Sequence, residues 1–286
     1  MASRKAVFLD VDGTLVNELG RVPDSSRRAV REARANGHLV FVCTGRSHAE
    51  LWPEIVEIGF DGFITGAGAH VQAGDDVLVD HHLPEDALRH IADFFGPLDV
   101  PFYFQAKDGI YATGDVRAQL RSVVAASVTD PDVLAALEVG LFGFIDEIQV
   151  SSDPFSAHVS KAIYLDSTVP LELIQAEFAG VLEVIRSSVT IFGENSGEMM
   201  MPGVHKATGI EVLIRHLGID RADTFAIGDS YNDLEMLAHV AVGIAMGDSP
   251  DAVQDVADEV TAGVDERGIH RAFVRHGLIG DVADAP

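Results

Sequence analysis

Residue types that bind metal ions and phosphate gather in three short segments of the 286-residue sequence. Asp10 and Asp12 stand in the segment DVDGT, a Thr-Gly-Arg segment begins at Thr44, and Asp229 opens the segment DSYND. Each segment directly follows a short apolar run, which is typical of a buried strand. Ligands of an open parallel sheet bind outside the carboxyl ends of its strands, so an active site is expected at these three segments.

Asp10 could attack phosphorus if the repulsion between its carboxylate and the phosphate were cancelled. Two like unit charges about 4 Å apart repel by roughly 4 kcal/mol at an effective dielectric of about 20. A hard divalent cation such as Mg²⁺, which prefers oxygen ligands, would remove that repulsion. Asp12 lies two residues after Asp10, so at strand spacing both side chains could project into one site, where Asp12 suits proton transfer. A solvated turn or a helix cap is the alternative interpretation of this pair taken alone.

The residues around these segments predict elements that would hold them at one edge of a sheet. Apolar strands and amphipathic helices alternate at both ends of the chain. The predicted strands are residues 5–9, 38–43, 224–227 and 240–245, and the predicted helices are residues 24–36, 209–217 and 233–239. This order is typical of βαβ units, which build a parallel sheet with both faces covered.

The middle of the chain follows a different order. Residues 101–113 alternate around Asp108-Gly109 as a β-hairpin, and later apolar runs at residues 142–150 and 161–165 are separated by helical stretches. The mixed order predicts an inserted α+β domain. The predicted bounds are residues 84–202 for the insert, and residues 1–83 and 203–286 for the α/β domain.

The three segments, together with Lys206 before the last of them, resemble the motifs of the haloacid dehalogenase (HAD) superfamily. Its phosphatase branch shows a DxDGT motif, a Thr-Gly-Arg turn, a lysine and a GDxxND motif in that order, and four motifs in order are much more specific than one. The long insert resembles the large α+β cap of the Cof-type subgroup, subfamily IIB. The resemblance implies a Rossmann-like core with a parallel sheet and an inserted α+β cap that selects the substrate. The sequence departs from the family pattern at Ala207, where glycine usually follows the lysine.

The resemblance also implies the catalytic and metal-binding residues. Asp10 would be the nucleophile and would carry an aspartyl-phosphate, while Asp12 would act as general acid and base. Mg²⁺ would be held by the side chains of Asp10 and Asp229 and by the backbone carbonyl of Asp12.

A second group of residues is expected, by the same resemblance, to contact phosphate or substrate: Thr44, Gly45, Lys206 and Asn232. Asp233 would either lie near the metal or orient Lys206. Arg46 would either contact the phosphate or pair with a carboxylate of the core. A rival lysine, Lys161, is better explained as part of a strand of the cap.

The composition restricts the partners and the compartment. The chain carries 45 acidic against 20 basic residues, a formal net charge of -25, which repels nucleic acid and anionic lipid at long range. No stretch of the sequence approaches the roughly 20 apolar residues of a membrane span. With a single cysteine, Cys43, no disulfide can close within the chain, so we expect a cytoplasmic protein. The twelve histidines form no HExxH pattern, and His81-His82 is predicted to be a surface pair.

These observations predict a Mg²⁺-dependent phosphatase that hydrolyses a small phosphomonoester, a sugar phosphate or a compound similar to pyridoxal phosphate. Two alternatives stay open at this point. A sugar phosphomutase would return the phosphoryl group to a sugar, and a non-catalytic signalling or binding protein would also use a phosphorylated aspartate. The sequence predicts neither the identity of the substrate nor the oligomeric state.

Overall fold

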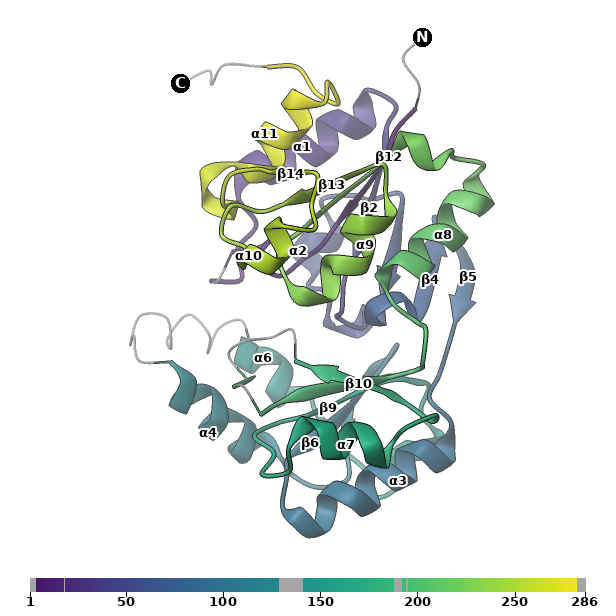
Figure 1. The fold of residues 1–286 in the computed structure, drawn as a ribbon, viewed down its shortest axis with the longest axis vertical. Helices are drawn as coiled ribbons and strands as arrows, with labels where there is room; N and C mark the ends of the chain where they lie inside the picture. The colour runs from purple at the N-terminus through teal and green to yellow at the C-terminus, as the bar shows by residue number, and fades with distance from the viewer. Residues whose placement is uncertain (1–3, 18, 129–140, 188–191, 194, 282–286) are drawn as a thin grey trace. The chain divides into compact units, whose positions relative to one another are not determined.

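The computed structural model describes residues 4–17, 19–128, 141–187, 192–193 and 195–281 (Figure 1). The chain divides into two compact units. The first comprises Met1–Gly45, Trp52–Val79 and His205–Pro286, and the second comprises Arg46–Leu51 and Asp80–Val204. No pattern in the sequence indicated that the short segment Arg46–Leu51 groups with the insert. The role of the insert as a substrate-selecting cap stays a prediction.

The first unit is built on an eight-stranded sheet with the order β14-β13-β12-β1-β2-β3-β4-β5. Its strands are β1 (Ala6–Leu9), β2 (Leu39–Cys43), β3 (Gly62–Thr65), β4 (His70–Ala73), β5 (Asp76–Asp80), β12 (Thr224–Gly228), β13 (Val242–Ala245) and β14 (Glu259–Val260). The strands from β14 to β3 pair in parallel, and β4 is antiparallel to β3. Leu9 is level with Ile227 of β12 and with Val42 of β2, so the carboxyl ends of these three strands lie side by side.

Helices cover both faces of this sheet, because successive side chains of each strand point to opposite faces. They are α1 (Asp24–Ala35), α2 (Pro53–Val56), α8 (Lys206–Leu217), α9 (Leu234–His239), α10 (Asp251–Gln254) and α11 (Gly268–Arg275). On one face, Phe8 and Phe41 stack at 5.3 Å between ring centroids and join a cluster with Leu213 of α8 and Met236 of α9. Figure 1 shows α1 and α11, which contact each other, on the other face. The predicted parallel sheet with both faces covered is confirmed.

The second unit contains a six-stranded sheet with the order β10-β11-β9-β6-β7-β8, antiparallel except between β7 and β8. Its elements are α3 (Glu85–Phe95), β6 (Phe102–Ala106), β7 (Gly109–Ala112), α4 (Arg117–Ser127), α6 (Leu141–Asp146), β8 (Gln149–Val150), β9 (Val159–Tyr164), α7 (Leu171–Glu177), β10 (Glu183–Arg186) and β11 (Gly197–Met200). Apolar clusters lie on both faces, one with α3 and α7 and one with α4 and α6. This unit therefore has the predicted α+β character.

Short 3₁₀ turns complete the described chain: η1 (His48–Glu50), η2 (Gly66–Gly68), η3 (Gly96–Leu98), η4 (Pro154–Ser156), η6 (Arg221–Asp223), η7 (Tyr231–Asp233) and η8 (Val264–Glu266). Within the described ranges, no helix combines the length and the apolar character needed to cross a membrane.

Two segments of the second unit have a predicted and an observed structure. The predicted hairpin is confirmed, since β6 and β7 pair antiparallel around Lys107 and Asp108. The apolar run at residues 142–150 is divided between helix α6 and the short strand β8. Phe144, Ile145 and Ile148 are buried in one cluster, and a short apolar run of this kind does not distinguish a helix from a strand.

Candidate active site

Three strand ends bring the predicted site residues to one edge of the first unit's sheet. Asp10 follows β1, Thr44 follows β2 and Asp229 follows β12. The N–H of Asp10 donates to the carbonyl oxygen of Ile227 at 3.0 Å, which extends the parallel pairing one residue beyond β1. Because β12, β1 and β2 are neighbours, the three residues meet at the edge where ligands of parallel sheets bind.

The loop after Asp10 requires glycine at position 13. Gly13 has a φ of 78°, and a Cβ there would lie 2.3 Å from Asp229 Oδ2. A larger residue would therefore push the loop away from Asp229. Thr14 Oγ1 donates to Asp229 Oδ1 at 2.7 Å, so the same loop also orients that carboxylate.

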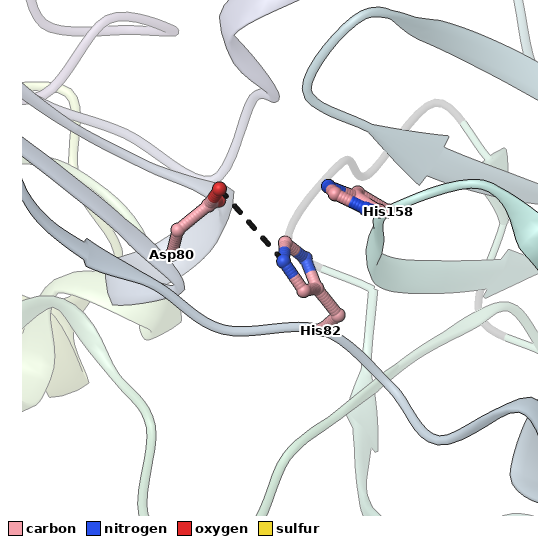
Figure 2. Close-up of side chains that lie close together, drawn as sticks. All are labelled: Asp80, His82 and His158. Atoms are coloured by element: carbon pink, nitrogen blue, oxygen red, sulfur yellow. Dashed lines mark ion pairs between the residues drawn. The ribbon is translucent and has the colours of Figure 1, made fainter.

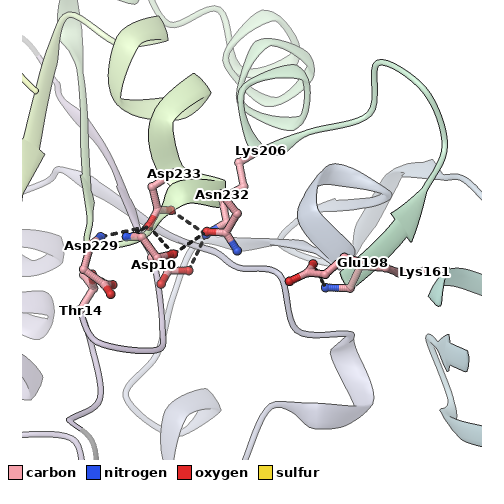
Figure 3. A network of polar contacts seen from close by, with 9 residues as sticks. Asp10, Thr14, Lys161, Glu198, Lys206, Asp229, Asn232 and Asp233 are labelled. Atoms are coloured by element: carbon pink, nitrogen blue, oxygen red, sulfur yellow. Dashed lines mark hydrogen bonds and ion pairs between the residues drawn. The ribbon is translucent and has the colours of Figure 1, made fainter. Parts of the chain in front are cut away.

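Lys206 is the cationic centre of the site (Figure 3). It is the first residue of α8 and is fully buried. Its Nζ donates to Asp10 Oδ1 at 2.6 Å, to Asp233 Oδ1 at 2.6 Å and to Asn232 Oδ1 at 3.0 Å. The sequence left two roles open for Asp233, and the structure pairs it with Lys206.

The glycine-rich turn η2 helps to place Lys206. Gly68 has a φ of 104°, and a Cβ there would lie 2.4 Å from the carbonyl oxygen of His205. The N–H of His205 donates to Thr208 Oγ1 at 3.1 Å, which caps the start of α8. The turn thus packs against the residue before Lys206.

Backbone N–H groups also hold the carboxylate of Asp233, in addition to Lys206. Asp233 is fully buried, and its Oδ2 accepts the N–H groups of Asp229 and Ser230, each at 3.0 Å. These contacts fold the GDSYND segment around one carboxylate and hold Asn232 and Asp229 in place. Gly228 allows this close fold, because a Cβ there would lie 2.5 Å from Asp233 Cγ.

Burial and mutual repulsion raise the pKa values of the site carboxyls. Burial raises the pKa of Asp10 to about 7 against the opposing charge of Lys206, with the charges of Asp233 and Asp12 adding to the rise. Burial, together with the charges of Asp10 and Asp233, raises the pKa of Asp229 to about 9. Burial alone would lower the pKa of Lys206, but the charges of Asp10 and Asp233 outweigh it and raise that pKa above its ordinary value. The site therefore contains more carboxyl groups than the single charge of Lys206 could neutralise if all of them were ionised.

The donor atoms of the site fit a hard cation. Carboxylate oxygens of Asp10, Asp229 and Asp233 all lie within 4.8 Å of one another, and oxygen-only sites suit Mg²⁺. The predicted ligands were the side chains of Asp10 and Asp229 and the carbonyl of Asp12. Asp12 lies in the loop beside Asp10 and is close enough for its charge to act on the pKa of Asp10. Asp233, for which the sequence left open a place near the metal or beside Lys206, lies in this cluster as well as beside Lys206.

Thr44 and Gly45 also belong to the first unit. The N–H of Thr44 donates to Ile64 at 2.8 Å, and its carbonyl oxygen accepts from Ala67 at 3.0 Å, so its backbone is fixed after β2. Cys43, the residue before Thr44, is buried, and burial raises the pKa of its thiol. The charges of Lys206, Asp233 and Asp10 also act on that thiol, which places the end of β2 beside the cluster.

Arg46 and Lys161 belong to the second unit. Arg46 Nη1 donates to the carbonyl oxygen of Glu50 at 3.4 Å. Lys161 lies in β9, as the sequence indicated, and forms an ion pair with Glu198 of β11 at 2.7 Å.

Thr14 belongs to the DVDGT segment, but its residue type and position alone predicted no role for it. Its hydrogen bond to Asp229 joins residues 215 positions apart. The type and place of Thr14 in the motif were the available signal, but only the fold reveals its partner.

Known proteins are similar to this chain over most of its length. A family model for haloacid dehalogenase-like hydrolases matches residues 7–273. YkrA of Bacillus subtilis (strain 168), provisionally named as a phosphatase, is 31% identical over 276 residues, which cover 96% of this chain and 98% of that protein. The 5-amino-6-(5-phospho-D-ribitylamino)uracil phosphatase YcsE of the same organism is 25% identical over 277 residues, with 96% of both chains covered.

A solved structure of a HAD phosphatase is also similar to this chain over nearly its whole length. The HAD subclass IIB sugar phosphatase BT4131 is similar with a TM-score of 0.75 and 26% identity, over 96% of this chain and 100% of that one. The predicted Rossmann-like core with an inserted α+β cap is confirmed by this likeness. Since the family model spans nearly the entire sequence, the chain belongs to the haloacid dehalogenase-like hydrolases, in the Cof-type group of phosphatases that its motifs resemble.

Proposed function

We propose that this phosphoric monoester hydrolase removes phosphate from a small phosphorylated metabolite, with Mg²⁺ as its cofactor and an aspartyl-phosphate on Asp10 as the intermediate. The observation that carries the proposal is the cluster that Asp10 and Asp229, at the carboxyl ends of the neighbouring parallel strands β1 and β12, form with Lys206 at the start of α8.

The first step would transfer the phosphoryl group to Asp10. A carboxylate oxygen of Asp10 attacks phosphorus, a P–O(Asp10) bond forms, and the P–O bond to the leaving group breaks. Asp12 gives a proton to the leaving oxygen. Lys206, held 2.6 Å from Asp10 Oδ1, would stabilise the charge of the transferring group.

The second step would release phosphate. Water attacks phosphorus and gives a proton to Asp12, the P–O(Asp10) bond breaks, and the Asp10 carboxylate is restored. Bound Mg²⁺ would neutralise the charge shared by the carboxylates and the phosphate. Its ligands would come from Asp10, Asp229 and the Asp12 carbonyl. Thr44, Gly45 and Asn232 would contact the phosphate or the rest of the substrate.

The proposed substrates are sugar phosphates and compounds similar to pyridoxal phosphate. The names of the sugar phosphatase BT4131 and of YcsE, whose substrate carries a phosphoribityl group, support this class. The net charge of -25 disfavours polyanionic substrates such as nucleic acid. We also propose that the enzyme acts in the cytoplasm, on the basis of its single cysteine.

Release of inorganic phosphate from a panel of phosphorylated metabolites tests the proposal. The wild-type enzyme should release phosphate with Mg²⁺ and lose this activity after chelation by EDTA. Asp10→Asn should abolish turnover while leaving the circular dichroism spectrum unchanged, because the amide is a poor nucleophile. Turnover by Asp10→Asn at the wild-type rate, or full activity after chelation, would contradict the proposal.

A further inference from the structure

The second unit contains three metal-ligating side chains that the proposed phosphatase chemistry does not use: Asp80, His82 and His158 (Figure 2). One ligand atom of each lies within 4.8 Å of those of the other two. Asp80 ends β5, His82 lies in the segment that follows, and His158 directly precedes β9. The cluster therefore joins residues that are distant in the sequence.

The backbone places the two imidazoles side by side. The N–H of Leu83 donates to the carbonyl oxygen of Val159 at 2.7 Å, so the residues that precede these two, His82 and His158, are neighbours. Leu83 and Val159 are buried in the same apolar cluster. The ring centroids of His82 and His158 lie 4.3 Å apart. Core packing of Leu83 and Val159 thus holds the backbone of His82 and His158 side by side.

Asp80, at the end of β5, lies beside the same two imidazoles. It lies two residues before His82, and in extended chain such side chains point to the same side. Its Oδ2 lies 3.8 Å from His82 Nε2, and the two side chains are 34% and 31% exposed. They are partly shielded from water but remain accessible to a dissolved ion.

We propose that Asp80, His82 and His158 bind a divalent cation of the zinc class. Two imidazole nitrogens and one carboxylate oxygen are a donor set typical of Zn²⁺, whereas Mg²⁺ prefers oxygen ligands alone. With metal–ligand bonds of about 2.0–2.1 Å, the ligand atoms of a tetrahedral site lie about 3.3 Å apart. The Asp80–His82 distance of 3.8 Å is close to this spacing, and rotation of the exposed His158 side chain brings in the third ligand. Water fills the remaining coordination.

A bound ion would fasten the first residues of the long segment of the second unit. Residues 80–84 begin that segment, and the ion would tie them to the residue before β9. The net charge of -25 raises the concentration of divalent cations near the surface. The two clusters of the enzyme would then select different metals through their different donor atoms.

Calorimetric titration of Zn²⁺ into the metal-free full-length protein tests the inference. Excess Mg²⁺ and an Asp229→Asn background would suppress Zn²⁺ binding at the proposed catalytic site. We expect one Zn²⁺ per chain in this background, and weakening of its affinity by at least about tenfold in both His82→Gln and His158→Gln. His81→Gln is the matched control, since His81 is exposed and lies outside the cluster.

A second measurement locates the ion without relying on variants that must fold. Zn²⁺ should protect His82 and His158, but not His81, from diethylpyrocarbonate, as read by peptide mass spectrometry. In the chain with the natural Asp229, both histidine variants should keep the Mg²⁺-dependent phosphatase activity and the melting temperature of the metal-free protein. Unchanged Zn²⁺ affinity in the two variants, an equal loss in His81→Gln, or equal modification of all three histidines would overturn the proposal.

Discussion

Two buried lysines, one in each unit, form similar ion pairs in different surroundings. Lys206 lies 2.6 Å from both Asp10 and Asp233, and Lys161 lies 2.7 Å from Glu198. Lys206 begins a helix and meets residues that follow parallel strands, whereas Lys161 and Glu198 lie within the antiparallel strands β9 and β11. Of the two, only the Lys206 pair lies among the residues predicted to form the active site.

The excess of carboxylates distinguishes the Lys206 site. Asp229 adds a third carboxylate to those of Asp10 and Asp233, and the raised pKa values of Asp10 and Asp229 record the unfavourable charge. Such an arrangement is costly unless a cation neutralises the excess negative charge. We therefore expect the two lysines to respond differently to the same substitution.

Lys206→Met should cause the larger loss of activity. The substitution removes the charge that faces the transferring phosphoryl group, and loss of one such donor lowers kcat by about 10²–10³-fold. Steady-state kinetics with p-nitrophenyl phosphate measures this loss. Lys161→Met is the matched control and should retain the wild-type kcat for this small substrate. An equal loss of kcat in the two variants would contradict the claim that only Lys206 takes part in the reaction.

Lys161→Met should mainly reduce stability. It leaves Glu198 buried without its ion-pair partner, which costs about 3–5 kcal/mol in the free energy of unfolding. The double variant Lys161→Met/Glu198→Met should recover most of this loss, because apolar residues of similar volume replace a buried ion pair at little cost. Urea denaturation measures both values. If the double variant had a lower free energy of unfolding than the single one, the unpaired charge of Glu198 would not explain the destabilisation.

Stability should depend on Mg²⁺ and pH together. The pKa values of Asp10 and Asp229 in the folded metal-free protein, about 7 and about 9, lie above the ordinary value of 3.8. The folded state holds protons that the unfolded state has released, so these groups make stability fall as the pH rises from about 4 to about 9. Because Mg²⁺ binds the deprotonated carboxylates, its stabilising effect should grow over the same range.

Thermal denaturation with and without Mg²⁺, at a series of pH values, checks this dependence. The difference in Tm should increase from acid to neutral and alkaline pH. A difference that stays constant would mean that Mg²⁺ does not compete with protons at these carboxyls.

Thr14→Val should have the smallest effect of these substitutions, a modest loss of Mg²⁺ affinity. It removes the hydroxyl that orients Asp229, and loss of such an outer contact weakens metal binding by about tenfold or somewhat more. Calorimetric titration of Mg²⁺ measures this change. Thr261→Val is a suitable control, because Thr261 also donates a buried hydrogen bond, to the carbonyl oxygen of Gly268 at 2.8 Å. An equal effect of both variants on Mg²⁺ affinity would argue against the orienting role of Thr14.

The grouping of the site residues could be predicted because it follows from local patterns. Asp10, Thr44 and Asp229 each end an apolar run, and a parallel sheet brings such ends to one edge. The first residue of α8 was harder to predict from the sequence. The sequence predicted a helix from residue 209, while the cap formed by His205 and Thr208 begins it at Lys206.

Contacts between residues distant in the sequence could not be predicted. The neighbours His82 and His158 depend on the pairing of Leu83 with Val159, and the sequence indicated only that His81 and His82 form a surface pair. The grouping of Arg46–Leu51 with the second unit likewise depends on tertiary contacts, among them the hydrogen bond from Gln105 to Glu50 at 2.8 Å.

Covalent capture of the intermediate tests the central claim most directly. The enzyme is mixed with substrate and Mg²⁺, quenched in acid during turnover, reduced with borohydride and digested, and the reduced position is located by mass spectrometry. Capture of phosphate on Asp10 should convert this residue, and no other aspartate, to homoserine. Homoserine at a different position, or none at all while phosphate is being released, would contradict the account.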